Sequence, residues 1–214
     1  MAPTGSLDAR VDHVVKLLVT GPFNAGKTTL IGAVSQTPVV DTDVATTGDE
    51  AATKTRTTVA MDFGTYTVVD DDGRIDLLLF GTPGQPRFGF MTDVMKGDVD
   101  AVISVVDGSD DATHDEAGTS MRALLHDLHV PLVVAVNRCD DHDSADVIAR
   151  RLGALASEAV LPCQLIDPDS SRGVVVAALV AALDRLEQPG SRPWRTPLQR
   201  VIDALTLRLA EEAA

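Results

Sequence analysis

A chain of 214 residues with 44% hydrophobic content can bury one substantial core, and we expect one domain with appended segments rather than two full domains. The 32 Asp and Glu residues against 18 Lys and Arg residues give a net charge of −14, which disfavours nucleic acid and anionic membranes as partners. The sequence has no apolar run of about 18 residues and no signal-peptide pattern, so it predicts a cytoplasmic protein with no membrane insertion.

Apolar runs rich in Val, Leu and Ile alternate with helical patterns along the chain. We predict strands at residues 13–20, 57–69, 75–80, 101–106, 132–136 and 160–166, and helices at residues 27–35, 113–127, 144–157 and 171–187. The Asp-Gly signal in "DDDGR" predicts a hairpin that joins the second and third strands as antiparallel neighbours. Runs that are apolar on both faces, such as "AVISVV" and "PLVVAV", are typical of parallel strands covered by helices. The sequence therefore predicts an α/β fold with a mostly parallel six-stranded sheet, helices on both faces, and ligands at the carboxyl ends of the strands.

Beyond this pattern, the stretch "QPGSRPWRTP" indicates a Pro-rich linker at residues 188–197. It separates a predicted domain at residues 11–187 from a predicted amphipathic helix at residues 198–211. The apolar residues of this helix share one face, and they are Leu198, Val201, Ile202, Leu205 and Leu209. Two interpretations remain open, because this face can pack on its own domain or bind a partner protein.

The stretch "LLVTGPFNAGKTTL" has the spacing GxxxxGKT, directly after a predicted strand and directly before a predicted helix. This spacing in this context is typical of a phosphate-binding loop. Glycines allow backbone N–H groups to turn toward phosphate oxygens, and the start of the helix adds its dipole. We expect Lys27 to neutralise the β- and γ-phosphates and the Thr28 hydroxyl to bind Mg²⁺. The predicted nucleotide-binding residues of the loop are Gly21, Asn24, Ala25, Gly26, Lys27, Thr28 and Thr29.

The stretch "VVAVNRCD" predicts which base is bound, because Asn137 and Asp140 follow a buried strand at the spacing NxxD. A carboxylate accepts hydrogen bonds from the N1–H and N2–H₂ groups of guanine, which adenine cannot supply, and an asparagine can connect the base to the phosphate loop. A site built on these hydrogen bonds would leave Asp140 unpaired if it held ATP, so we predict GTP and GDP as ligands. In an alternative interpretation, Asn137 and Asp140 only cap the following helix.

In order along the chain, "GPFNAGKT", "TTVAMDFG", "GTPGQPRF" and "NRCD" resemble the motifs of Ras-like small GTPases, over residues 11–187. In particular, the chain is similar to the bacterial gliding-motility MglA type and to the conservon-encoded (CvnD-like) GTPases. The resemblance implies the small-GTPase form of the P-loop NTPase fold, with Mg²⁺ as a cofactor and a GDP/GTP switch that hydrolyses GTP slowly. It also implies a roadblock/LC7-domain regulator and a sensor-kinase-like protein as partners.

The resemblance assigns roles to the two switch segments. Thr58 corresponds to the threonine that binds Mg²⁺ and the γ-phosphate, with Thr57 as the alternative if the register differs by one. Gly84 corresponds to the glycine whose N–H contacts the γ-phosphate. Gln85 corresponds to the glutamine that orients the attacking water.

The resemblance also suggests residues for transition-state stabilisation and for base binding. Arg56 is the first candidate for an arginine that stabilises charge in the transition state, and Arg87 is the second. Arg138 replaces the usual lysine of NKxD, and its stem can still lie along the base. The segment "DPDSS" occupies the place of the last base-binding loop, which makes Asp167 and Pro168 candidate base contacts.

Two further features depart from the family pattern. Phe23 and Asn24 stand where relatives have small residues and are expected to crowd the γ-phosphate. Gly81 stands where most relatives have an aspartate that holds a magnesium-bound water; losing such a partner weakens metal binding about 10–100-fold. The substitution Gly81→Asp is then expected to tighten Mg²⁺ binding or leave it unchanged. Asp62 is a candidate replacement, but four residues of strand separate it from Thr58 by about 13 Å, so the strand would have to slide.

Two other functions remain open at this stage. One is a pseudo-GTPase, an interaction module that binds guanine nucleotide without significant turnover, as Gly81 and Phe23 suggest. The other is a P-loop kinase for a small molecule, which would need an arginine-rich lid that residues 108–127 do not supply. Cys139 and Cys163 fit a reducing compartment, and they form no metal-binding pattern with the histidines.

Overall fold

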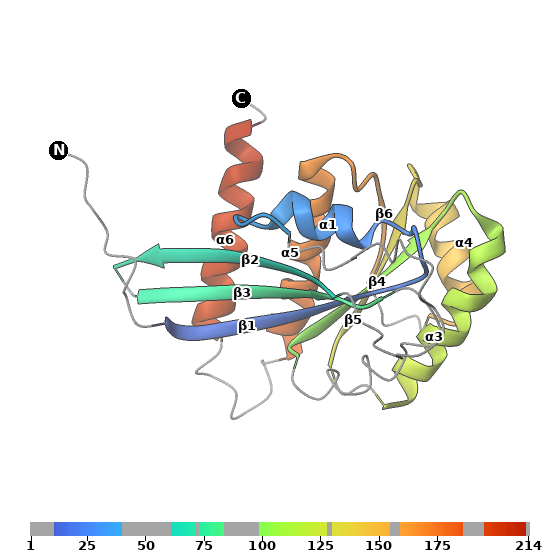
Figure 1. Ribbon diagram of the computed structural model, residues 1–214, viewed down its shortest axis with the longest axis horizontal. Helices are drawn as coiled ribbons and strands as arrows, with labels where there is room; N and C mark the ends of the chain where they lie inside the picture. Colours follow the sequence, from blue (N-terminus) through green and yellow to red (C-terminus); the bar gives the residue numbers. More distant parts are fainter. Residues whose placement is uncertain are drawn as a thin grey trace, which may run out of the picture.

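The strands form one six-stranded sheet in the order β2-β3-β1-β4-β5-β6 (Figure 1). The computed structural model describes residues 11–39, 61–71, 73–83, 99–127, 130–154, 159–185 and 195–212. Strand β2 is antiparallel to β3, and every other neighbouring pair is parallel, which confirms the predicted sheet. The strands are β1 (Val11–Thr20), β2 (Asp62–Asp70), β3 (Gly73–Gly81), β4 (Ala101–Asp107), β5 (Leu132–Asn137) and β6 (Ala159–Cys163).

Helices cover both faces of the sheet, as the doubly apolar strands predict. Along β4, Ile103 and Val105 belong to one buried cluster, whereas Val102 and Val106 belong to the other. Side chains of α1, α5 and α6 complete the first cluster, and side chains of α3 and α4 complete the second. The helices are α1 (Lys27–Val34), α3 (His114–Asp127), α4 (His142–Leu152), α5 (Pro168–Arg185) and α6 (Arg195–Glu212), with a short 3₁₀ helix η3 (Asp111–Thr113) before α3.

The predicted hairpin between the second and third strands is confirmed. Asp70 on β2 pairs with Gly73 on β3, and the antiparallel register continues to Asp62 opposite Gly81 at the other end. Gly73 has a φ of 116°, a left-handed conformation that favours glycine. The hairpin therefore carries Asp62 to the end of the sheet where the phosphate loop lies.

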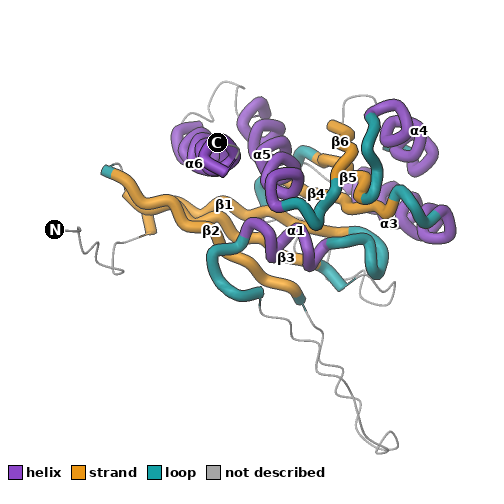
Figure 2. The backbone as a smooth tube through the Cα atoms, turned by 90° about the horizontal axis from the view of Figure 1, so that it is seen from above, coloured by secondary structure: helices purple, strands orange, loops and turns teal. Residues whose placement is uncertain are grey.

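Helix α6 packs on its own domain, which matches the first of the two interpretations of the C-terminal helix. It lies beside α5 in both views (Figures 1 and 2), and its apolar residues Leu198, Val201 and Leu205 are part of the buried core. Arg200 makes an ion pair with Asp70 at the hairpin and also donates to the Gly73 carbonyl at 2.9 Å. No helix of the described residues is long and apolar enough to cross a bilayer.

Several element ends differ from the sequence-based expectation. Helix α4 ends at Leu152 rather than at residue 157, because Gly153 takes a left-handed φ of 94° and its N–H bonds to the last turn. Strand β6 ends at Cys163 rather than at residue 166, and α5 already starts at Pro168, where a proline suits the first helical position. Helix α6 starts at Arg195, so the last residues of the predicted linker are helical.

Candidate functional site

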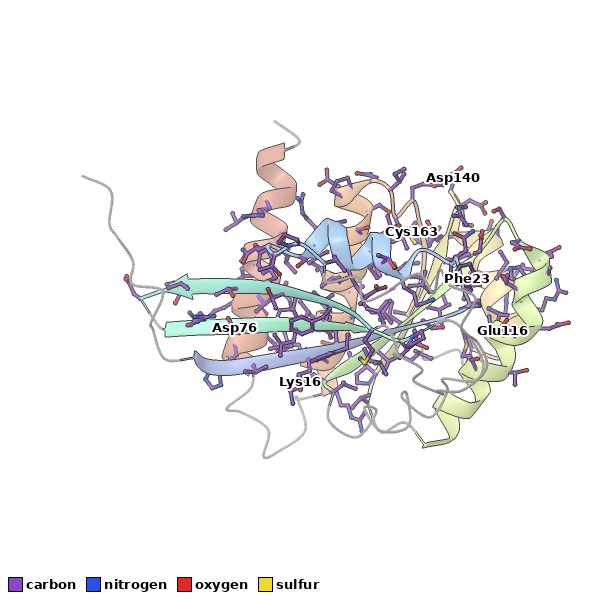
Figure 3. All side chains as sticks on the ribbon, viewed as in Figure 1. Lys16, Phe23, Asp76, Glu116, Asp140 and Cys163 are labelled. Atoms are coloured by element: carbon purple, nitrogen blue, oxygen red, sulfur yellow. The ribbon has the colours of Figure 1, made fainter. Side chains whose placement is uncertain are left out.

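The phosphate loop, the NxxD segment and the segment "DPDSS" lie at the carboxyl ends of β1, β5 and β6, and β4 lies between β1 and β5 in the sheet. Figure 3 shows Phe23, Asp140 and Cys163 at this end of the molecule, with Glu116 of α3 nearby, whereas Asp76 on β3 lies away from it. The fold therefore brings the predicted phosphate-binding and base-binding segments together. This is the edge at which open α/β sheets bind ligands.

Two glycines shape the loop between β1 and α1. Gly21 has a φ of 140°, and a Cβ atom there would lie 2.0 Å from the Val105 carbonyl oxygen of β4. Gly26, at the N-cap of α1, has a φ of 111°, and its Cβ would lie 2.6 Å from Nδ2 of Asn137. Asn24 is also left-handed, with a φ of 60°. The loop is thus closely enclosed by β4 and by Asn137 at the end of β5, as a backbone cradle for phosphate requires.

Lys27 starts α1, and its side chain folds back over the phosphate loop. Its Nζ donates to the carbonyl oxygens of Gly21 at 2.9 Å and Pro22 at 2.6 Å. The residue is buried, and this desolvation lowers the pKa of the Lys27 ammonium to about 8, although the nearby carboxylates of Asp62 and Glu116 act in the opposite direction. A bound phosphate would supply the negative charge that favours the ammonium form.

This lowered pKa predicts proton uptake when a nucleotide binds. At pH 8.5, Lys27 with a pKa of about 8 is mostly neutral in the free protein. Phosphate binding should protonate it, so we expect an uptake of about three quarters of a proton. At pH 6.5 the uptake from Lys27 should be close to zero, and binding should weaken as the pH rises above 8. Calorimetry in two buffers of different ionisation enthalpy measures the uptake. In Lys27→Arg the side chain stays charged, so the uptake at pH 8.5 should disappear; its persistence would assign the proton to another group.

Thr28 and Thr29 are exposed on the first turn of α1. The Thr28 hydroxyl donates to Oδ2 of Asp62 at 2.6 Å, a contact between α1 and β2. The other predicted magnesium ligand, Thr58, lies outside the described residues, as do Arg56, Gly84, Gln85 and Arg87. The roles of these residues stay predictions.

Asn137 joins three loops of the site. Its Nδ2 donates to the carbonyl oxygen of Ala25 in the phosphate loop at 2.9 Å. Its Oδ1 accepts from the backbone N–H of Leu165, in the turn after β6, and from that of Arg138, both at 3.0 Å. The structure therefore contains the predicted asparagine connection to the phosphate loop, and it adds the turn after β6 to the same network.

Asp140 is exposed, and its Oδ1 accepts a hydrogen bond of 2.7 Å from Nε2 of Gln164. The N-cap of α4 is the next residue, Asp141, whose Oδ1 accepts from the Ser144 N–H at 2.7 Å. That hydrogen bond lowers the pKa of the Asp141 carboxyl. The interpretation of Asn137 and Asp140 as simple helix caps is therefore wrong, and the Asp140 carboxylate is available to a ligand.

Arg138 follows Asn137 in a left-handed conformation, with a φ of 58°. Its guanidinium makes an ion pair with Asp107, a buried carboxylate at the carboxyl end of β4. Asp107 also accepts from the N–H and hydroxyl of Ser109, at 2.9 and 2.7 Å. Asp107 was not among the residues predicted from the sequence, although an acidic residue at the end of a mostly apolar strand is a detectable signal.

The turn after β6 occupies the predicted place, but its two candidate residues are used locally. The N–H of Asp167 donates to the Gln164 carbonyl at 2.8 Å, and its carboxylate accepts from the Asp169 N–H at 3.1 Å. Pro168 begins α5 and has no N–H to offer. Ile166, which no motif predicted, is 88% exposed beside them. The structure thus places Asp167 and Pro168 near the site without showing a free donor on either.

Phe23 and the two cysteines complete the surroundings of the loops. The side chain of Phe23 is 69% exposed on the phosphate loop (Figure 3). Cys139 and Cys163 are both buried free thiols. Burial is the larger cause and the charge of Cys139 the smaller cause that together raise the pKa of the Cys163 thiol to about 12. Among the residues that the structure describes, no cluster of three or more His, Cys, Asp or Glu side chains could hold a metal ion.

Known proteins with similar sequences include Ras-related and GTP-binding proteins. The chain is 27% identical over 183 residues to the Ras-related protein Rab-13 of Mesocricetus auratus, covering 85% of this chain and 84% of the relative. It is 24% identical over 196 residues to the Ras-related protein Rab-8 of Diplobatis ommata, covering 91% of this chain and 88% of the relative. It is 26% identical over 149 residues to the GTP-binding protein ypt2 of Schizosaccharomyces pombe, covering 69% of this chain and 68% of the relative. This distant homology supports a small GTPase, whereas the bacterial MglA and conservon types remain a prediction.

A comparison with protein-family profiles matches residues 39–163, from the segment after α1 to the end of β6. The match includes the Asn137 to Asp140 segment and begins beyond the phosphate loop. Since it spans more than half of the sequence, the chain belongs to the family described as "Conserved hypothetical ATP binding protein".

Proposed function

We propose that this protein is a guanine-nucleotide switch that binds GTP and GDP with Mg²⁺ and hydrolyses GTP slowly. The observation that carries the proposal is the Asn137 side chain, which bonds to the phosphate loop at Ala25 and to the turn after β6 at Leu165. This link holds a phosphate-binding loop and an exposed carboxylate, Asp140, at one end of the sheet. A nucleotide whose phosphates lie on this loop can place its base against the Asp140 carboxylate, so a single ligand contacts both groups.

The choice between guanine and adenine rests on Asp140, because the family description names ATP, whereas ypt2 is described as GTP-binding. The phosphate loop fits either nucleotide, since it contacts only phosphates. An ionised carboxylate can only accept hydrogen bonds, and guanine offers donors at N1 and N2. Adenine has an acceptor at N1 and no donor at C2, so ATP would leave the charged side chain without its partners.

Competition binding tests the base directly. Protein freed of nucleotide is titrated with a fluorescent GDP in the presence of Mg²⁺, and unlabelled GDP and ADP are used as competitors. We expect GDP to bind at least ~10³-fold more tightly than ADP, the scale of discrimination in sites that hydrogen-bond their ligand. Chromatography of the nucleotide released from purified protein by heat should likewise yield GDP or GTP. Equal affinity for ADP, or no binding of either nucleotide, would contradict the proposal.

For hydrolysis we propose roles for residues that lie outside the described part of the chain. Gln85 orients the water, Arg56 stabilises charge in the transition state, and Thr58 binds Mg²⁺ together with Thr28. The N–H of Gly84 contacts the γ-phosphate. In single-turnover assays Gln85→Leu should remove hydrolysis while GTP binding persists. We further propose a cytoplasmic switch regulated by a roadblock/LC7-domain protein, with a sensor-kinase-like protein as a second partner.

A second candidate function is a pseudo-GTPase that binds guanine nucleotide without significant turnover. The exposed Phe23 favours it, because this bulky side chain stands on the phosphate loop where it can hinder access of a catalytic group. Single-turnover hydrolysis with and without a roadblock partner separates the two functions. A switch is accelerated by its regulator and loses the acceleration in Gln85→Leu, whereas a pseudo-GTPase shows no hydrolysis in either condition.

A further inference from the structure

The side chain of Gln164 holds the carboxylate on which the choice of base rests. Its Nε2 donates a hydrogen bond of 2.7 Å to Oδ1 of Asp140, 24 positions earlier in the chain. An ionised carboxylate can only accept hydrogen bonds, so the nitrogen of the Gln164 amide, and not its oxygen, must face it. Asp140 is exposed and Gln164 is partly exposed, so the contact lies within reach of a ligand. Figure 3 labels Asp140 and Cys163, the residue before Gln164, at this end of the molecule.

The backbone of Gln164 is fixed on both sides, which makes its side chain a suitable anchor. Gln164 directly follows Cys163, the last residue of β6, which pairs with Asn137 in the sheet. Its N–H donates to Oγ of Ser170 in α5 at 2.9 Å, and its carbonyl oxygen accepts from the N–H of Asp167 at 2.8 Å. The sheet and the start of α5 therefore set the position of the Gln164 amide relative to the end of β5.

A carboxylate that is held at one oxygen suits guanine better than one that rotates freely. The terminal torsion of an aspartate is broad, so an unrestrained Asp140 carboxylate can adopt many orientations. Guanine presents two donors side by side, at N1 and N2, and one carboxylate must face both of them at once. An ionised carboxylate has about four lone-pair sites, and the bond from Gln164 leaves most of them for a ligand. Restricting the carboxylate beforehand lowers the entropy that is lost on binding.

We propose that Gln164 is a positioning residue for base recognition, which fixes the plane of the Asp140 carboxylate and so favours bases with donors at both N1 and C2. This inference rests on the proposed binding of guanine nucleotide at Asp140. No motif in the sequence includes Gln164. In the turn after β6, the Asp167 carboxylate is an acceptor and Pro168 has no N–H, whereas Gln164 supplies the donor.

The test compares GDP with inosine diphosphate (IDP), which lacks only the 2-amino group. The full-length protein, freed of nucleotide, is titrated with fluorescent GDP, and unlabelled GDP and IDP serve as competitors. The wild type should bind GDP about 10–100-fold more tightly than IDP, the effect of one hydrogen bond to a charged group. Gln164→Met keeps an unbranched side chain but removes the donor. In this variant the preference for GDP should fall about 3–10-fold, while the IDP affinity stays within about twofold of the wild-type value.

Gln164→Glu separates an orienting role from simple packing. The substitution keeps the size and shape of the side chain but replaces the donor with an acceptor, and the introduced charge repels the Asp140 carboxylate. An orienting role predicts that Gln164→Glu reduces the preference for GDP more than Gln164→Met does. A packing role predicts the reverse order, because the isosteric change is the milder one. Since the contact is exposed, the melting temperatures of both variants should lie within about 2 °C of the wild-type value.

Gln199→Met is the matched control for the loss of the donor. On α6, Nε2 of Gln199 donates to Oδ1 of Asp203 at 2.8 Å, so the same two groups form the same kind of hydrogen bond. Helix α6 lies away from β5 and β6 in both views (Figures 1 and 2). This variant should keep the wild-type preference for GDP over IDP.

Two results would overturn the proposal. One is a Gln164→Met protein that folds and keeps the wild-type ratio of GDP to IDP affinity. The other is a Gln164→Glu protein that distinguishes GDP from IDP better than Gln164→Met does. Failure of the proposed function looks different, because the wild-type protein itself would then bind ADP as tightly as GDP, or bind neither, and the role of Gln164 would fall with it.

Discussion

Gly21→Ala should destabilise the protein by about 3 kcal/mol or more, one of the largest effects expected from a single methyl group. The added Cβ would lie 2.0 Å from the carbonyl oxygen of Val105, and the φ of 140° is one that side chains rarely adopt. Strands β1 and β4 are hydrogen-bonded neighbours in the middle of the sheet, so neither can retreat without breaking the pairing of Thr20 with Ser104. Urea denaturation followed by circular dichroism measures the loss.

Gly173→Ala is the matched control for this substitution. Gly173 lies inside α5, and a Cβ atom there would have no other atom within 4 Å. Alanine is the better helix former, so this variant should gain about 1 kcal/mol of stability. The same Gly→Ala substitution should therefore lower the free energy of unfolding at position 21 and raise it at position 173. If Gly21→Ala cost less than about 1 kcal/mol, the close approach of β4 to the phosphate loop would be incorrect.

The central part of the fold could be predicted because its signals are local. Strands β4 and β5 are mostly apolar and are buried at every position, as in a sheet that is covered on both faces. The Asp-Gly turn fixed the antiparallel hairpin in the same way. The end of α4 was also readable, since Gly153 is a typical C-terminal residue, but the apolar run beyond it favoured a longer helix. The short β6 was harder, because its end depends on Leu165 bonding to Asn137, a contact 28 positions away.

The phosphate loop could be predicted for the same reason, whereas the partners of its residues could not. Glycine spacing identifies the loop, but nothing local to Asp62 says that its carboxylate meets Thr28, 34 positions earlier. That contact depends on the register of β2 against β3, which the hairpin turn sets at the opposite end of both strands. From the sequence, Gly81 indicated a missing aspartate, and Asp62 was only a candidate replacement for it. The expectation that Gly81→Asp tightens Mg²⁺ binding or leaves it unchanged stays a prediction, although a Cβ atom at position 81 would lie only 2.8 Å from Cβ of Asp62.

Asp140→Asn should exchange the base preference of the site. The substitution removes the acceptor for the N2–H₂ group of guanine and replaces it with an amide donor. The lost charge-assisted hydrogen bond contributes about 1.5–3 kcal/mol to binding. The new amide donor also faces the N2–H₂ donor of guanine, so GDP binding should weaken about 100-fold or more. Xanthosine diphosphate has a carbonyl oxygen at C2, which the new amide can donate to, so its affinity should rise above that of GDP. Competition binding with fluorescent nucleotides measures both changes.

The neighbouring residue provides the control that makes this result specific. Asp141→Asn is the same chemical change one position along the chain, but Asp141 caps α4 through the Ser144 N–H. Asparagine caps helices about as well as aspartate, so this variant should keep both its stability and its preference for guanine. If Asp140→Asn prefers xanthine nucleotides and Asp141→Asn does not, the base binds at residue 140, as the Asn137 network requires. A wild-type preference for adenine nucleotides, unaffected by either substitution, would instead support the ATP named in the family description.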